Sequence, residues 1–294
     1  MRSWAFDEGE ELASGRHAVR LLGGGHRYEA YLAWDDRMRT LVVAKLVRPD
    51  QVDDDRARAT LAHEARLLER LAHPLLVRSF GATTEGERPH LVLEFVEGPR
   101  LSTLIRRFGV VLEQALPLAL NVSAVLHYLA ARGVVHLDVK PRNLIMAGAP
   151  RLIDLSVARE LDRLCELRTP VGTDAYMAPE QCRPERFADI GPASDVWGLG
   201  VTLFEALTGR LPYPRPRPEL PFPQLTHEPE ALDTDLPLGL QAVLVACLER
   251  DPLNRPSAAQ VGDALEPLVE SLPAPRIGKF RPGARELERR LELT

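Results

Sequence analysis

Cysteine is scarce in this chain of 294 residues: it occurs three times, at the widely spaced positions Cys165, Cys182 and Cys247. So few scattered cysteines exclude a disulfide framework and a cysteine-rich zinc site, and they favour a reducing, cytoplasmic compartment. No uninterrupted apolar run approaches the ~20 residues that span a bilayer, and the first residues lack the apolar core of a signal peptide. The sequence therefore predicts no membrane span.

An excess of positive charge is also absent. The formal net charge is −5, so nucleic acid is not expected as a partner. Hydrophobic residues make up 45% of the chain and charged residues 27%, which places it among ordinary globular proteins. A chain of this length can form one or two domains around a sizeable core.

Lysine and asparagine are rare, with three of each, although lysine and arginine together number 37. Arginine therefore supplies charge wherever any cation is adequate, and a lysine indicates a position that needs a compact ammonium group. Two of the lysines, Lys45 and Lys140, and one of the asparagines, Asn143, lie in segments whose other residues suit phosphate chemistry.

The segment from His136 to Asn143 carries a carboxylate, an ammonium group and an amide, at Asp138, Lys140 and Asn143, between two apolar runs. A second carboxylate, Asp154, follows eleven residues after Asn143. In phosphoryl transfer an acid orients the attacking hydroxyl, a cation faces the phosphate, and an amide and a second acid hold metal ions. The segment therefore predicts a phosphoryl-transfer site.

A glycine cluster, Gly23–Gly25, lies between two strand-like runs and predicts a hairpin. It is either a plain turn or a lid whose backbone N–H groups approach phosphates. The β-rich run 40–47 carries Lys45 near its end, and a helix is expected from about Asp54 to Leu71. On that helix Glu64 borders an apolar stripe, where it either faces solvent or pairs with Lys45.

Two further strand-like runs, 75–80 and 90–96, precede a break at residues 97–99, and the remainder of the chain is mostly helical. Strands with one helix, followed by a helical remainder, indicate a two-lobed α+β fold. The later helices are expected at 101–108, 112–132, 194–207, 238–250 and 257–272.

Three segments lie outside this pattern. Residues 1–15 are polar and predict a loosely held leader. Six of the twelve residues 212–223 are proline, which predicts an extended spacer or docking loop. Residues 273–294 form a basic tail, which is either a solvated terminal helix or a helix that binds a partner.

Seven features in order resemble the eukaryotic-type (Hanks-type) serine/threonine protein kinases, most of all the actinobacterial members, over about residues 16–272. These features are Val43-Ala44-Lys45, Glu64, His136-Leu137-Asp138, Asp154-Leu155-Ser156, Ala178-Pro179-Glu180, Asp195-Val196-Trp197-Gly198 and Arg255.

The resemblance implies a kinase fold with two lobes. Residues 16–96 would form a small N-lobe, a five-stranded antiparallel sheet with one helix, and residues 97–272 a larger, mainly helical C-lobe. It also implies the cofactors ATP and Mg²⁺, with Mn²⁺ as an alternative, and protein substrates whose Ser/Thr hydroxyls receive the γ-phosphoryl group.

The resemblance further assigns the site residue by residue. Catalytic roles fall to Asp138 as the base and to Lys140, Asn143, Lys45 and Glu64. Metal binding falls to Asn143 and Asp154, and the activation segment contains Thr169 and Thr173. Contacts to ATP are expected from Leu22, Gly23, Gly25, Ala30, Ala44, Lys45, Glu94, Val96, Ile145 and Asp154.

Three positions depart from the family pattern. Tyr28 replaces the third glycine of the loop, which predicts slower nucleotide turnover. Leu137 replaces the arginine that binds a phosphorylated activation loop, so we expect a non-RD kinase whose activity does not depend on a phosphate at Thr169. Ser156 replaces a glycine and restricts the backbone after Asp154.

Two other functions stay open beside that of a protein kinase. One is a pseudokinase or scaffold that binds partner proteins, which the three departures favour. The other is a small-molecule phosphotransferase of the antibiotic-kinase kind, against which Lys140 and the segment 172–180 argue, because they build a peptide-binding surface. As a kinase the chain is expected to act in the cytoplasm, as a monomer or weak dimer.

Overall fold

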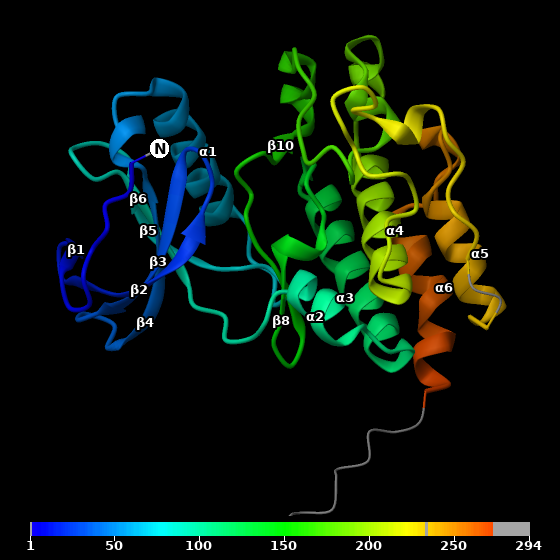
Figure 1. The fold of residues 1–294 in the computed structure, drawn as a ribbon, viewed down its shortest axis with the longest axis horizontal. Helices are drawn as coiled ribbons and strands as arrows, with labels where there is room; N and C mark the ends of the chain where they lie inside the picture. The colour runs from blue at the N-terminus through cyan, green and yellow to red at the C-terminus, as the bar shows by residue number, and fades with distance from the viewer. Residues whose placement is uncertain (1, 233–234, 273–294) are drawn as a thin grey trace, which may run out of the picture.

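The chain forms two lobes that lie side by side and are joined near residues 95–100 (Figure 1). This computed structural model describes residues 2–232 and 235–272. The smaller lobe, at the left of Figure 1, holds the sheet and one helix, and the larger lobe is mainly helical. The expected two-lobed α+β architecture is therefore confirmed, whereas the tail 273–294 lies outside the described residues.

The N-lobe sheet has six antiparallel strands in the order β1-β2-β3-β4-β6-β5. The strands are β1 (Glu11–Ala13), β2 (Arg16–Gly24), β3 (Tyr28–Asp35), β4 (Thr40–Val47), β5 (Ser79–Thr83) and β6 (His90–Glu94). The prediction of five strands was wrong by one, because β1 belongs to the segment expected as a leader.

That segment is part of the lobe rather than loosely held. Leu12 is fully buried, and Trp4 and Phe6 pack over the same core cluster as Tyr31. The indole Nε1 of Trp4 donates a hydrogen bond to the carbonyl of Val47 at 2.8 Å. A few apolar side chains in a polar segment are enough to hold it, because each of them finds a partner on the outer face of the sheet.

The helix of the N-lobe, α1 (Asp55–Arg70), begins and ends where the sequence indicates. Its N-cap, Asp54, accepts a hydrogen bond from the Arg56 amide, which satisfies one of the free donors of the first turn. Leu61 and Leu68 lie on its buried face, and Glu64 is buried on that face as well. A buried carboxylate requires a partner, and its partner is described below.

The C-lobe is built on three packed helices, α3 (Leu112–Ala131), α4 (Pro192–Thr208) and α6 (Ala258–Glu270), with α2 (Leu101–Phe108) and α5 (Leu238–Cys247) beside them. By length and composition alone α3 could cross a membrane. Half of its apolar window is buried inside the lobe, against α4 and α6. A core helix of a globular protein has the same properties, so α3 is weak support for a membrane span.

A buried ion pair fixes the middle of the C-lobe. Arg255 donates from Nη1 and Nη2 to the two carboxylate oxygens of Glu180, at 2.7 and 2.8 Å, and both side chains are inaccessible to solvent. Ser194, in the first turn of α4, donates to the same carboxylate at 2.7 Å. The pair thus joins the segment before α4, α4 itself and the segment before α6.

We expect Arg255→Met to lower the free energy of unfolding by about 3–5 kcal/mol, because it leaves the Glu180 charge buried without its partner. The matched control is Arg250→Met, which removes a more exposed arginine paired with Glu228 and should cost less than about 1 kcal/mol. Urea unfolding of the three proteins measures both effects. Equal stability of Arg255→Met and Arg250→Met would contradict the central role of the buried pair.

Candidate active site

The catalytic loop is held from below by α4. The carboxylate of Asp195 accepts hydrogen bonds from the backbone N–H groups of His136 and Leu137, both at 2.7 Å. Burial raises the pKa of Asp195 to about 6. Leu137 has a left-handed backbone with φ of +64°, a conformation that costs about 1–2 kcal/mol for a residue with a side chain. The two hydrogen bonds to Asp195 hold the loop in this strained form.

Asp138 lies at the centre of the expected catalytic group. Its carboxylate accepts hydrogen bonds from Lys140 Nζ at 2.7 Å, Thr173 Oγ1 at 2.7 Å and Asn143 Nδ2 at 3.0 Å. Lys140 Nζ also donates to Thr173 Oγ1 at 2.5 Å. The hydroxyl of Thr173 thus shows that one hydroxyl group can meet this acid and this cation at the same time. Such a position suits a hydroxyl that is to attack a phosphate.

A glycine allows the activation segment to approach the catalytic loop so closely. Gly172 has a φ of +129°, and a Cβ atom on it would lie 2.7 Å from the carbonyl oxygen of Leu137. Next to it, Gln181 donates from Nε2 to the carbonyls of Leu137 and Val171, at 3.0 and 2.8 Å. Sequence reasoning missed Gln181, although its place directly after Ala178-Pro179-Glu180 could have drawn attention to it.

Lys45 joins the two lobes. Its Nζ donates to Glu64 at 2.7 Å and to Asp154 at 2.8 Å, so the expected contact between Lys45 and Glu64 is formed. Burial alone would lower the pKa of Lys45, but the two carboxylates raise it well above its ordinary value. Burial would likewise raise the pKa of Asp154, but the Lys45 ammonium group holds it far below its usual range. Burial raises the pKa of Glu64 above its ordinary value, although the Lys45 ammonium group acts against that rise.

Two oxygen donors remain for a cation. The amide nitrogen of Asn143 donates to Asp138, so its amide oxygen remains for a cation. Asp154 accepts from Lys45 and from the Ser156 amide through Oδ1, so its Oδ2 remains. The amide of Ile153 donates to the carbonyl of Asn143 at 2.9 Å, which brings the two segments together. Within the described residues no group of three acidic, histidine or cysteine side chains could hold a metal. The donors therefore fit Mg²⁺, which is usually held by one or two protein oxygens together with substrate phosphates.

The strand register corrects one expected ATP contact. Ala30 lies directly opposite Lys45, so their side chains share one face of the sheet, whereas Ala44 lies opposite Tyr31 on the other face. Ala44 packs with Leu12 and Tyr31 in a cluster on the outer face of the sheet, so it does not lie on the face that carries Lys45. The residue next to Lys45 on the same face of the sheet is Val43, because side chains two residues apart on a strand point the same way.

The other expected ATP contacts lie at the glycine hairpin, at the end of β6 and just after it, and in β8. Gly23 is opposite Ala30, and Leu22 and Gly25 adjoin it at the hairpin. The Glu94 side chain pairs with Arg78 and Arg151 and is therefore engaged outside the cleft. Among the described residues the backbone N–H of Val96 has no hydrogen-bond partner, as a hinge amide that binds a base requires. Ile145 lies at the other side, in β8 (Leu144–Met146).

Tyr28 points into the N-lobe from the glycine hairpin (Gly23–Tyr28). Its hydroxyl donates to the carbonyl of Ala57 in the first turn of α1 at 2.7 Å, and the Lys45 Nζ lies 5.1 Å from the centre of its ring. The side chain therefore connects the hairpin to α1 beside the Lys45–Glu64 pair. Tyr28, expected as a residue of the glycine loop, is the first residue of β3, and strand alternation puts it on the face of Ala30 and Lys45.

Leu137 is buried in a cluster of apolar side chains that come from β7, the activation segment and the residues just before α4. The cluster contains Val135, Leu164 and Ile190, with Val157, Leu167 and Val171 packed against it. Thr169 lies in the same segment with its side chain exposed to solvent. The position that holds an arginine in the family pattern thus contributes hydrophobic contact and no charge.

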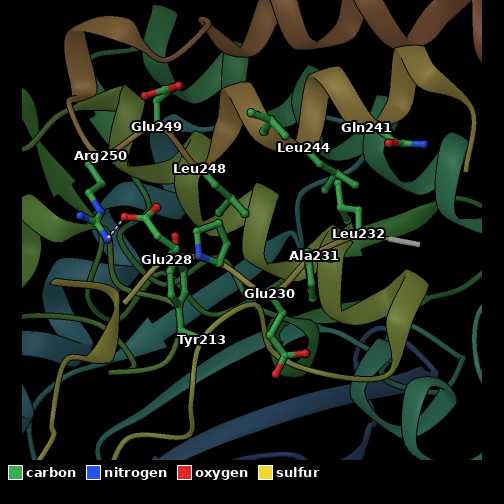
Figure 2. Close-up of a pocket in the computed structure, with 13 residues that line it drawn as sticks. Tyr213, Glu228, Glu230, Ala231, Leu232, Gln241, Leu244, Leu248, Glu249 and Arg250 are labelled. Carbon is green, nitrogen blue, oxygen red and sulfur yellow. Dashed lines mark ion pairs between the residues drawn. The ribbon is translucent and has the colours of Figure 1, made fainter. Parts of the chain in front are cut away.

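A separate cavity of about 500 Å³ lies on the C-lobe, between α5 and the segment 228–232 (Figure 2). Arg250 and Glu228 form an ion pair at its rim, at 3.0 Å, and Tyr213 and Leu248 line it. None of the site residues expected from the sequence lines this cavity. It is therefore no part of the group built around Asp138 and Lys45.

Comparison with known proteins agrees with this geometry. Residues 16–264 match the model of the protein kinase domain. The chain is 32% identical over 247 residues to a probable serine/threonine-protein kinase, PkwA, of Thermomonospora curvata, covering 83% of this chain and 33% of the relative. It is 29% identical over 250 residues to the serine/threonine-protein kinase PknB of Mycolicibacterium smegmatis, covering 80% of this chain and 40% of the relative.

A third relative, the serine/threonine-protein kinase pkn2 of Myxococcus xanthus, is 30% identical over 290 residues, which are 92% of this chain and 34% of the relative. The matched part thus spans a third to two fifths of the length of these relatives. With the domain matched from β2 to α6 and the expected catalytic residues assembled around Asp138, the chain belongs to the protein kinase family.

Proposed function

We propose that this member of the family is an active serine/threonine protein kinase of the non-RD type. It uses ATP and Mg²⁺ and acts on protein substrates in the cytoplasm, as a monomer or weak dimer. The proposal that the protein binds ATP rests on one observation: Lys45 contacts Glu64 and Asp154 at the same time. This arrangement places an ammonium group beside a metal-binding carboxylate, where the phosphates of a nucleotide are to be held.

The chain's own residues have separate tasks in the transfer. Asp138 accepts the hydrogen bond of the acceptor hydroxyl and takes its proton as the hydroxyl oxygen bonds to the γ-phosphorus and the bond from that phosphorus to the leaving ADP breaks. Lys140 donates a hydrogen bond to the same carboxylate, and its positive charge stabilises the negative charge of the transferred phosphoryl group. Asn143 and Asp154 would hold Mg²⁺, which when bound neutralises the developing phosphate charge. Glu64 keeps Lys45 in place from α1.

The alternative of a pseudokinase or scaffold is weakened by how the departures are accommodated. Ser156 does not require a left-handed backbone, and Leu155 beside it is fully buried and donates its amide to Glu64 at 3.1 Å. Tyr28 leaves the Lys45–Glu64 contact intact. The small-molecule phosphotransferase is disfavoured because Thr173 of the activation segment is bonded to Asp138 and Lys140, next to where a peptide would bind.

The non-RD assignment is supported by the packing around Leu137. In an arginine-containing kinase the loop is ordered by charge-assisted hydrogen bonds to a phosphate. Here Leu164 and Ile190 pack against Leu137. Gln181 donates a hydrogen bond to the Leu137 carbonyl, and the lack of a side chain at Gly172 lets the backbone approach the same carbonyl closely. Hydrophobic burial can therefore hold the activation segment without a phosphate.

Transfer of label from γ-labelled ATP to a generic Ser/Thr protein, with Mg²⁺ or Mn²⁺, tests the activity directly. We expect Lys45→Ala and Asp138→Ala to lose more than about a hundredfold in rate, because each removes a charge that acts on the transferred group. Circular dichroism and thermal melting check that the variants are folded. Nucleotide binding without any label transfer by the wild-type protein would favour the scaffold instead.

Thr169→Ala should keep its rate within about tenfold of the wild-type rate, or ~1.4 kcal/mol, because the activation segment is held by apolar contacts. Thr173→Ala is the matched comparison, since it removes the hydroxyl bonded to Asp138 and Lys140, and should lose about 10- to 100-fold. Initial rates with a fixed peptide measure both. A larger loss at Thr169 than at Thr173 would contradict the non-RD proposal.

Tyr28→Phe should lower kcat/KM for ATP by about 2- to 12-fold, because it removes the hydrogen bond that links the glycine hairpin to α1. Tyr128→Phe is the matched control, since the Tyr128 hydroxyl accepts a hydrogen bond from the Ala72 amide away from the cleft. Steady-state kinetics with varied ATP distinguishes them. Equal values for the two variants would show that Tyr28 does not position the hairpin.

A further inference from the structure

Two arginines without an acidic partner meet beside the catalytic loop. Arg100 directly precedes α2, and Arg142 lies between Pro141 and Asn143 in the short helix η2 (Pro141–Asn143). Within the described residues neither arginine has an ion-pair or side-chain hydrogen-bond partner. Glu94, six residues before Arg100 in the chain, forms its ion pairs with Arg78 and Arg151 instead.

The backbone aims Arg100 at the cleft. Arg100 forms an isolated antiparallel bridge with Ile145, and residues directly opposite each other in such a bridge place their side chains on the same face. Pro99 accepts a hydrogen bond from the Met146 amide at 2.8 Å, which fixes this register. Since Ile145 is an expected contact of the nucleotide, Arg100 projects toward the space between the lobes.

The charges of the two arginines act on each other. Burial, and then the charge of Arg142, lower the pKa of Arg100, whereas the carboxylate of Asp154 raises it. The helix α2, which Arg100 directly precedes, packs against η2, which contains Arg142, so the two charges lie in neighbouring elements. Two neighbouring cations that form no ion pair with an acid repel each other, and an anion bound to both would relieve that repulsion.

We propose that Arg100 and Arg142 form a binding site for an acidic side chain of the protein substrate, close to the Ser or Thr that is phosphorylated. This inference rests on the proposed kinase function. Arg142 is exposed and lies two residues from Lys140, which bonds to the position of the acceptor hydroxyl. A guanidinium group binds a carboxylate through two parallel hydrogen bonds, so two of them can select an acidic peptide strongly.

Three matched peptides test the site, each with one serine and with glutamate, alanine or arginine at the flanking positions. The wild-type protein should phosphorylate the glutamate peptide with a kcat/KM at least about tenfold above that of the alanine peptide. The preference should shrink as salt is raised, because the arginines are partly exposed.

Arg142→Glu and Arg100→Glu should abolish this ratio or reverse it toward the arginine peptide. Arg107→Glu is the matched control, because it makes the same charge change at an exposed position of α2 and should leave the ratio unchanged. The KM for ATP is measured in each variant, with nucleotide binding as a check of folding.

Equal kcat/KM for the three peptides in the wild-type protein, or a ratio that survives Arg142→Glu, overturns the inference while the kinase function stands. A change of the KM for ATP in Arg100→Glu and Arg142→Glu with an unchanged peptide ratio also overturns it, since the pair would then serve the nucleotide. Phosphorylation of none of the peptides, nor of a generic protein, overturns the proposed activity and this inference together.

Discussion

The ion pair of Lys45 with Glu64 and Asp154 is the interaction on which the rest of the site depends. It connects β4, α1 and the segment after β9 (Pro150–Leu152), which are three elements from both lobes. Burial disfavours the charge of each partner, and the attraction between Lys45 and the two carboxylates opposes that effect. Because Glu64 also accepts the Leu155 amide, a shift of α1 would disturb the metal-binding aspartate as well.

The C-lobe supplies a rigid base for this pair. Asp195 holds the catalytic loop through two backbone amides, and the Glu180–Arg255 pair fixes the segments on either side of α4. Leu137, between these anchors, replaces a charged contact by an apolar one. A hydrophobic contact is always present, whereas a contact to phosphate has to be added, so this loop is built in its ordered form.

In the N-lobe, local sequence signals explain the bounds of α1, whereas packing explains the position of the N-terminal segment. Hydrophobic periodicity and N-capping placed α1 within one residue at each end, because these signals act within the helix. The leader was misjudged because Trp4, Phe6 and Leu12 are stabilised by partners on β3 and β4 that lie far along the chain. Ala44 was expected to contact ATP, although strand alternation puts Val43 and not Ala44 on the face of Lys45. That error came from applying the family motif, since the sequence itself contained the information.

The sequence by itself indicated the two-lobed fold and the helices, because hydrophobic periodicity and caps are local properties. It also indicated the candidate catalytic residues, through the rarity of lysine and asparagine and through the resemblance to a known family. Only the tertiary structure decided which charges meet. It joined Lys45 to Asp154, buried Leu137 under the activation segment, turned Tyr28 toward α1 and left Arg100 and Arg142 without an acid. Contacts between residues far apart in the chain depend on the packing of whole elements, which no short stretch of sequence specifies.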